Sequence, residues 1–202
     1  MVLLLPRKKP QRGKRYGRKI GSGKYSGIRL IHERPQEVQW RESFGHWEAD
    51  TIGFATSPYV NVTTLVERKS RYTKLIKNTS RKSKVVMPAI EKLMNSSAHK
   101  VWKTITFDQG SEFANHQAIE SNSKCKTYYC DPHSPWQRGN NENMNGRLRY
   151  YLPRHIEITH IQQKELVQIE KKINNLPRKC LQFKTPREVF SQHWKAVCRS
   201  YF

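Results

Sequence analysis

The stretch HWEADTIGFATSPYVNVTTLVERKSRYTKLIKN, residues 46–78, contains three short runs rich in β-branched and aromatic residues. Turn residues separate these runs, with Ser57-Pro58 after the first and Lys69-Ser70 after the second. Runs of this composition between turns are typical of β-strands, and three in succession form an antiparallel meander. We therefore expect strands over residues 46–55, 59–68 and 71–78, with Trp47 in the core.

Outward from the meander, helix and strand patterns alternate. Val86, Ile90, Leu93 and Met94 recur at helical spacing within residues 83–94. Further segments follow: a strand at 103–108 with Phe107 in the core, a helix at 112–121, a strand at 126–130, a helix between Gly139 and Leu152, and a last amphipathic helix at 162–176. The order βββαβαβα, then α, predicts an α/β fold with a mixed sheet flanked by helices.

The chain is strongly basic, with 38 Lys and Arg against 16 Asp and Glu and a formal net charge of +22. A positive field of this size attracts polyanions, of which nucleic acid is the usual one. A ribosomal-type or merely soluble basic protein is the alternative from composition. Eleven Lys and Arg but one acid, Glu33, lie between Arg7 and Arg34, among repeated glycines. We therefore predict a flexible basic arm over residues 1–36, a core over 37–195 and a tail over 196–202.

The cysteines and the N-terminus argue against a secreted or membrane protein. Cys125, Cys130, Cys180 and Cys198 lack the spacing of a disulfide framework, and Cys125, Cys130 and His133 lack a fourth zinc ligand. Reduced thiols in a cytoplasmic protein are the simpler account. The opening MVLLLP is too short for a signal peptide, and its charges follow it. No apolar run approaches the ~20 residues of a membrane helix.

Acids are scarce, so their positions are informative. Glu48 and Asp50 project to the same face of their strand, and Asp108 ends the fourth strand, where α/β sheets place ligand sites. Glu142 lies near a helix start, away from the apolar face formed by Met144, Leu148, Tyr151 and Leu152. Acids on a basic protein suit Mg²⁺, and two ions about 3.5–4 Å apart promote phosphoryl transfer. From spacing alone, Asp50 could equally be an edge-strand charge, Asp108 a turn residue and Glu142 an acid favoured by the helix dipole.

Five segments in order add a family resemblance. They are FGHWEADT (44–51), LVERKSRY (65–72), ITFDQGSEFANH (105–116), DPHSPWQRGNNENMNGRLRYYLP (131–153) and FKTPREVF (183–190). Together they resemble transposases of the insertion-sequence thirty family, which are Asp-Asp-Glu transposases related to retroviral-type integrases. The resemblance covers roughly residues 28–195, and the 33 residues between Asp108 and Glu142 match the spacing that it implies.

The resemblance implies a ribonuclease-H-like core that cleaves DNA strands and transfers them during transposition. Asp50, Asp108 and Glu142 would be the catalytic residues and the ligands of two Mg²⁺ ions, which Mn²⁺ can replace; Glu48 and Gln109 would support them. On this hypothesis, hydrolysis at the element end releases a 3′-hydroxyl, which then attacks target DNA.

We expect a further group of residues around the third acid to contact DNA, namely Gln137, Arg138, Asn141, Asn145, Arg147 and Arg149. Trp136 is expected to pack beneath its loop. The expected partners are double-stranded DNA, both element ends and target, and further copies of the chain in a homo-multimer. The expected location is the bacterial cytoplasm, on the nucleoid, without membrane contact.

The chain departs from the family pattern in three places. His46 stands where the family usually has Asp, and Gln109 where it usually has Asn. A short basic arm stands where the family has a helix-turn-helix region, so the chain looks like an N-terminally truncated catalytic half. Two alternatives follow, a catalytically inactive DNA-binding relic or regulator of a full-length transposase, and a ribonuclease-H-like nuclease without strand transfer.

Overall fold

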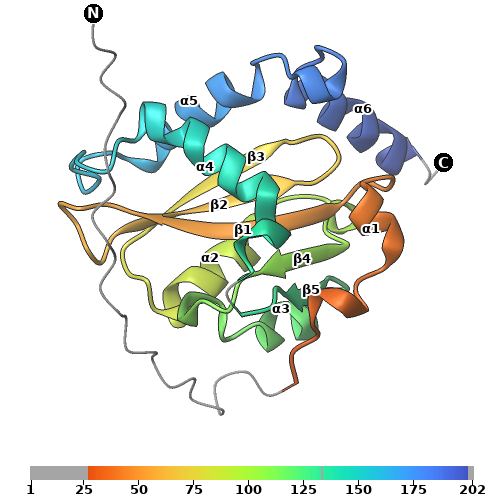
Figure 1. Cartoon of the computed structure of the whole chain (residues 1–202), viewed down its shortest axis with the longest axis horizontal. Helices are drawn as coiled ribbons and strands as arrows, with labels where there is room; N and C mark the ends of the chain where they lie inside the picture. The colour runs from red at the N-terminus through yellow and green to blue at the C-terminus, as the bar shows by residue number, and fades with distance from the viewer. Residues whose placement is uncertain (1–26, 133, 200–202) are drawn as a thin grey trace, which may run out of the picture.

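The computed structural model describes residues 27–132 and 134–199. Its centre is a five-stranded sheet in the order β3-β2-β1-β4-β5 (Figure 1). The strands are β1 (His46–Gly53), β2 (Asn61–Glu67), β3 (Thr73–Asn78), β4 (Thr104–Phe107) and β5 (Lys126–Tyr129). The first three strands pair antiparallel, whereas β4 runs parallel to β1 and β5 parallel to β4. The predicted meander and mixed sheet are confirmed.

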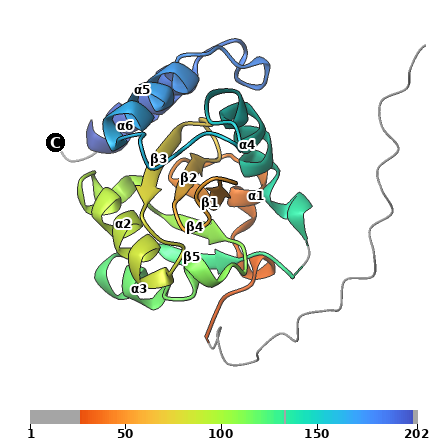
Figure 2. The same cartoon turned by 90° about the vertical axis from the view of Figure 1, so that its left-hand side faces the viewer.

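Helices cover both faces of this sheet. They are α1 (Gln36–Trp40), α2 (Ser83–Asn95), α3 (Gln117–Asn122), α4 (Gly139–Tyr151), α5 (Gln163–Asn174) and α6 (Pro186–Arg199). Figure 2 shows α2 and α3 on one side of the sheet and α4 and α5 on the other. Within the described residues, no helix is both long enough and apolar enough to cross a membrane.

Strand β1 contributes to two cores because its side chains alternate between faces. Trp47 and Ala49 belong to the core that includes α2 and Phe107. Trp47 and Phe107 are both buried, as predicted. Ile52 belongs to the core on the other face, with Met144 and Leu148 of α4. Each such fully buried side chain contributes roughly 1.5–3 kcal/mol. The even-numbered side chains of β1, which include Glu48 and Asp50, therefore face α4.

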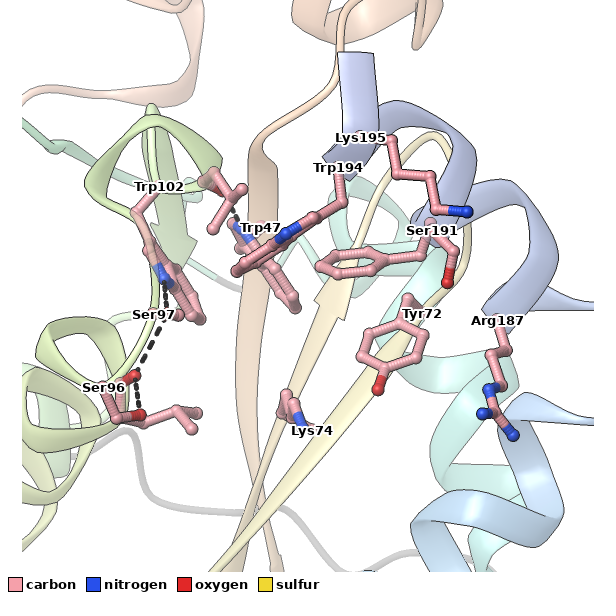
Figure 3. Close-up of a pocket in the computed structure, with 13 residues that line it drawn as sticks. Trp47, Tyr72, Lys74, Ser96, Ser97, Trp102, Arg187, Ser191, Trp194 and Lys195 are labelled. Atoms are coloured by element: carbon pink, nitrogen blue, oxygen red, sulfur yellow. Dashed lines mark hydrogen bonds between the residues drawn. The ribbon is translucent and has the colours of Figure 1, made fainter. Parts of the chain in front are cut away.

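Helix α6 corrects the prediction that the last helix of the chain ends at residue 176. Helix α6 extends to Arg199, so residues 196–199 of the predicted tail are helical. Phe190 of α6 stacks on Tyr72, with ring centroids 4.2 Å apart, and contacts Trp47 edge-on. These rings line an aromatic cavity of about 440 Å³ between α6 and the sheet (Figure 3). The signal in the sequence was Pro186 at a helix start, followed by Phe190 and Trp194 at helical spacing.

Residues 27–36 do not form part of a free arm. Leu30 makes a parallel bridge to Tyr129 of β5, whose amide donates to the carbonyl of Arg29 over 2.8 Å. Arg34 is buried, and its guanidinium donates to Thr106 Oγ1 and Gln39 Oε1. The predicted arm is therefore wrong for this stretch, because its partners lie about a hundred residues away and leave no local pattern. Its remainder, residues 1–26, and residues 200–202 of the tail lie outside the described residues.

Candidate active site

The register between β1 and β4 brings two of the three predicted acids together. The last paired residues of this parallel ladder are Glu48 and Thr106. Asp50 lies two residues after Glu48, and Asp108 lies two residues after Thr106. Because strand side chains alternate between faces, each acid points to the same face of the sheet as the residue two positions before it. Asp108 is the first residue after β4. Asp50 therefore lies inside β1 just past its pairing with β4, and Asp108 lies at the carboxyl end of β4, where open α/β sheets bind ligands.

Asp50 is held by two hydrogen bonds of different origin. Its Oδ1 accepts from the backbone amide of Thr51 over 2.8 Å, and its Oδ2 accepts from Asn145 Nδ2 on α4 over 2.9 Å. Asn145 Oδ1 in turn accepts from Thr64 Oγ1 of β2 over 3.1 Å. Asn145, which we predicted to contact DNA, therefore orients the carboxylate of Asp50 in this structure.

The loop after β4 places Asp108 beside a fourth acid that sequence analysis missed. Asp108 Oδ1 accepts from the Gly110 amide over 2.9 Å. A Cβ at residue 110 would lie 2.8 Å from both Asp108 Oδ1 and Glu112 Oε2, so a larger residue would push these two carboxylates aside. Glu112 is buried, and its Oε1 accepts from Thr51 Oγ1 over 2.6 Å. Glu112 thereby ties the Asp108 loop to the end of β1; the available signal was an acid just after a glycine turn.

Glu142 is exposed on α4, away from the helix's buried stripe, as predicted. It precedes Asn145 by three residues, so the two share one flank of the helix, the flank that reaches Asp50. Within the part of the chain that the structure describes, no three His, Cys, Asp or Glu side chains are grouped closely enough to hold a metal ion. Asp50 and Asp108 are thus prearranged, whereas Glu142 is near them in the fold without closing a ligand cage.

Glu48 lies in a buried polar network beneath the start of α4. Its Oε1 accepts from Arg68 Nη1 and, over 3.2 Å, from Asn140 Nδ2. Both members of the ion pair are buried. Burial, with repulsion from Arg34, Arg41 and Arg71, lowers the pKa of Arg68 to about 9, which leaves it charged at neutral pH. Glu48 therefore fixes the start of α4 on the sheet.

His46, at the position where the family usually has Asp, is a buried structural residue. Its ring nitrogens hydrogen-bond the hydroxyls of Thr104 and Ser43 over 2.9 and 2.7 Å. Burial, reinforced by the charges of Lys103, Arg34 and Arg68, lowers its pKa to about 4, so the ring is neutral at physiological pH.

Three predicted residues hold loops by hydrogen bonds. Gln137 bonds twice to Asp131, through its Oε1 to the backbone amide and through its Nε2 to the carboxylate. Gln109 Nε2 donates to the Cys130 carbonyl over 3.1 Å. Arg149 donates to the Gly53 and Leu152 carbonyls, and its guanidinium lies over the Phe54 ring. These side chains stabilise the rim of the site.

The structure corrects two predictions near the start of α4. Asn141 is fully buried, so we drop it from the expected DNA contacts. Trp136 is 73% exposed, because the short 3-10 helix Pro135–Arg138 presents it to solvent instead of packing it beneath the loop. Arg147 is exposed and donates to Asn143 Oδ1 over 3.1 Å. His133 and the side chain of Arg138 lie outside the described residues.

The strand order, with Asp50 on β1, Asp108 directly after β4 and a third acid on the covering helix, is that of an integrase-type, ribonuclease-H-like core. In agreement, residues 41–135 match the family model described as the integrase core domain.

Similarity to curated proteins extends beyond that domain. The chain is 38% identical over 182 residues, 89% of its length, to "Transposase InsI for insertion sequence element IS30A" of Escherichia coli. It is 38% identical over 185 residues to the transposase for IS1086 of Cupriavidus metallidurans, and 34% over 190 residues to that for IS4351 of Bacteroides fragilis. The chain spans about half the length of these relatives, 47%, 54% and 56% respectively. The resemblance to insertion-sequence thirty transposases is thereby confirmed.

Proposed function

We propose that this chain carries the catalytic core of a transposase, which cleaves DNA strands and joins them to target DNA during movement of an insertion sequence. The observation that carries the proposal is the register of β1 and β4, which brings Asp50 and Asp108 together under the helix that bears Glu142. The net charge of +22 supports a polyanionic substrate. The names of the relatives supply the reaction class.

Asp50, Asp108 and Glu142 are the proposed holders of two divalent ions, with Mg²⁺ as the natural ion and Mn²⁺ as a substitute. The donor set fits, because Mg²⁺ prefers oxygen ligands and commonly takes only one or two carboxylates, with water and substrate phosphates completing its shell. Asp50 and Asp108 supply that pair, and exposed Glu142 can change rotamer without disturbing the core. When bound, such ions neutralise phosphate charge and lower the pKa of the attacking hydroxyl.

The other residues of the site position the acids and the DNA. Asn145 orients Asp50, and the Gly110 amide orients Asp108, so neither carboxylate has to be ordered when substrate binds. Arg147, and Arg138 near the start of α4, are proposed to contact the phosphates of double-stranded DNA at element ends and target. The protein is proposed to act as a homo-multimer on nucleoid DNA in the cytoplasm.

The test is plasmid nicking and strand joining by the purified chain. Supercoiled plasmid is incubated with Mg²⁺ or Mn²⁺, beside an EDTA control and the variants Asp108→Asn and Glu142→Gln. Glu91→Gln, an acid-to-amide change on α2 across the sheet, is the matched control. We expect metal-dependent nicking and joining that both active-site variants abolish and the control keeps.

Two other outcomes point to the alternatives. Folded protein that binds DNA in a salt-dependent way without nicking it would be an inactive DNA-binding relic or regulator. Nicking without joined products would indicate a nuclease.

A further inference from the structure

A cationic cavity of about 510 Å³ lies on the opposite flank of α4 from Glu142 and Asn145. It is formed where the end of α1, the turn between β2 and β3, helix α4 and the loop after α5 meet. Its lining includes five cationic residues, Arg41, Arg71, Arg147, Arg178 and Lys179. Among the described residues that line it, none is Asp or Glu. We call it the Arg178 cavity.

The arginines of the Arg178 cavity are close enough to repel one another. Arg41 Nη2 donates to Asn140 Oδ1 over 3.3 Å, and Arg71 Nη1 donates to the same oxygen. Burial is the main cause that lowers the pKa of Arg41, and the positive charge of Arg71 is the second. The pKa of Arg178 is likewise lowered mainly by burial and secondly by the positive charge of Arg147. Two guanidinium groups thus share one neutral amide oxygen, and an anion would relieve the repulsion.

Arg178 supplies the sharpest sign of a missing acceptor. Only 5% of it is exposed, and its Nη2 donates to the Ile173 carbonyl at the end of α5 over 3.1 Å. Its backbone amide donates to the Lys184 carbonyl over 3.0 Å, which further fixes its position. Its Nη1 is buried and has no hydrogen-bond partner among the described residues. Buried donors are nearly always paired, and the described residues supply no acceptor for this N–H, which an anion entering the cavity would provide.

We propose that the Arg178 cavity binds a backbone phosphate of duplex DNA. The planar guanidinium fork matches phosphate oxygens, which accept several N–H groups at once. The cavity and the acids lie on the two flanks of one helix, so a duplex whose reacting strand reaches the acids can lay a neighbouring phosphate in the cavity. The choice of DNA over a free anion rests on the proposed function. The inference that the cavity binds an anion of some kind is independent of that function.

Cys180 offers a local reporter, because it lines the cavity and is exposed, whereas Cys125 and Cys130 are buried. The experiment measures the alkylation rate of Cys180 by a maleimide in a Cys198→Ser background, with EDTA present to prevent cleavage. We expect saturating duplex DNA to slow alkylation at least about five-fold, because a bound backbone covers the thiol. Inorganic phosphate at millimolar concentration should have little effect. Unchanged alkylation while DNA is bound would overturn the proposal, and equal protection by inorganic phosphate would reduce the cavity to a free-anion site.

Charge-removal variants test the same cavity by affinity. Arg178→Gln and Arg147→Gln should each weaken DNA binding roughly 3- to 10-fold and lower the slope of log K against log salt by about 1. Lys92→Gln, which removes one exposed charge from α2, is the matched control and should keep the slope. Arg147 is exposed, so its variant should fold even if Arg178→Gln does not. The proposal would be contradicted if folded Arg147→Gln showed the same slope of log K against log salt as the Lys92→Gln control.

These binding assays are independent of catalysis. Protection of Cys180 without plasmid nicking would keep the cavity and reject the proposed enzyme. Nicking with an unprotected Cys180 would support the proposed enzyme and reject the cavity as a DNA-phosphate site.

Discussion

Asn145 on α4 donates its side-chain amide to Asp50 on β1 over 2.9 Å. This bond joins the helix that carries Glu142 directly to the strand that carries the first acid. Because Asn145 also accepts from Thr64 of β2, it is held from two strands and cannot rotate freely. Asn145 thus helps to set the relative placement of the first and third acids.

Asn145→Ala should therefore lower plasmid nicking by about 10- to 100-fold, since misplacement of a catalytic group by ~1 Å costs about that much. The free energy of unfolding should fall by only about 1 kcal/mol, the value of a typical hydrogen bond. Nicking rates at saturating plasmid and urea denaturation measure the two effects. Asn95→Ala, at an exposed position ending α2, is the control. Equal rates for both variants would mean that Asn145 does not position Asp50.

Gly110→Ala should displace Asp108, because the added Cβ would lie 2.8 Å from oxygens of both Asp108 and Glu112. We expect at least a ten-fold loss of nicking and a destabilisation of about 1–3 kcal/mol, as for an overpacked site. Gly146→Ala is the contrasting variant, since open space surrounds its Cβ position within helix α4. It should stabilise the protein by roughly 0.5–1 kcal/mol. Urea unfolding that ranks the two variants the other way would contradict the close approach at Gly110.

Protonation of His46 should lower the free energy of unfolding as the pH falls. Its pKa in the folded state, about 4, is below the ordinary 6.5, so the unfolded chain binds a proton first. The stabilising contribution is therefore complete above pH 6.5 and is lost as the pH falls towards 4. It amounts to at most about 3 kcal/mol.

The measurement is the free energy of unfolding by urea between pH 7 and pH 4.5, for the wild type and His46→Gln. We expect a shallower pH dependence in the variant, because the remaining titrating groups are common to both proteins. Parallel curves would show that His46 does not carry the effect.

The Glu48–Arg68 pair should be costly to break from one side only. Arg68→Met leaves the Glu48 carboxylate buried without its cation, which should destabilise the protein by about 3–5 kcal/mol. The double variant Glu48→Leu/Arg68→Met removes both charges and should recover much of that loss. A double-mutant cycle by urea denaturation measures the coupling. Strict additivity of the two single changes would show that the charges do not interact.

Much of the fold is predictable because its signals are local. Runs of β-branched and aromatic residues separated by turn dipeptides indicate the meander of β1 to β3, and the spacing of Met144 and Leu148 indicates the buried face of α4. The prediction missed α6 although Phe190 and Trp194 stand at helical spacing; their aromatic partners include Trp47 of β1 and Tyr72 just before β3. Residues 27–36, which pair with β5, left no such local pattern. No periodicity within a short window reports on a partner a hundred residues away.

By itself, the sequence determined the order of the five strands and of helices α2 to α5, the basic charge, and three candidate acids at a strand interior, a strand end and a helix start. These follow from side-chain periodicity and turn chemistry, which act over a few residues. Only the tertiary structure decided that Asn145 orients Asp50, that Glu112 approaches Asp108, that Asn141 is buried and that Arg178 lacks an acceptor. Strand register and the rotation of α4 on the sheet set these contacts, and both depend on packing between segments far apart in the chain.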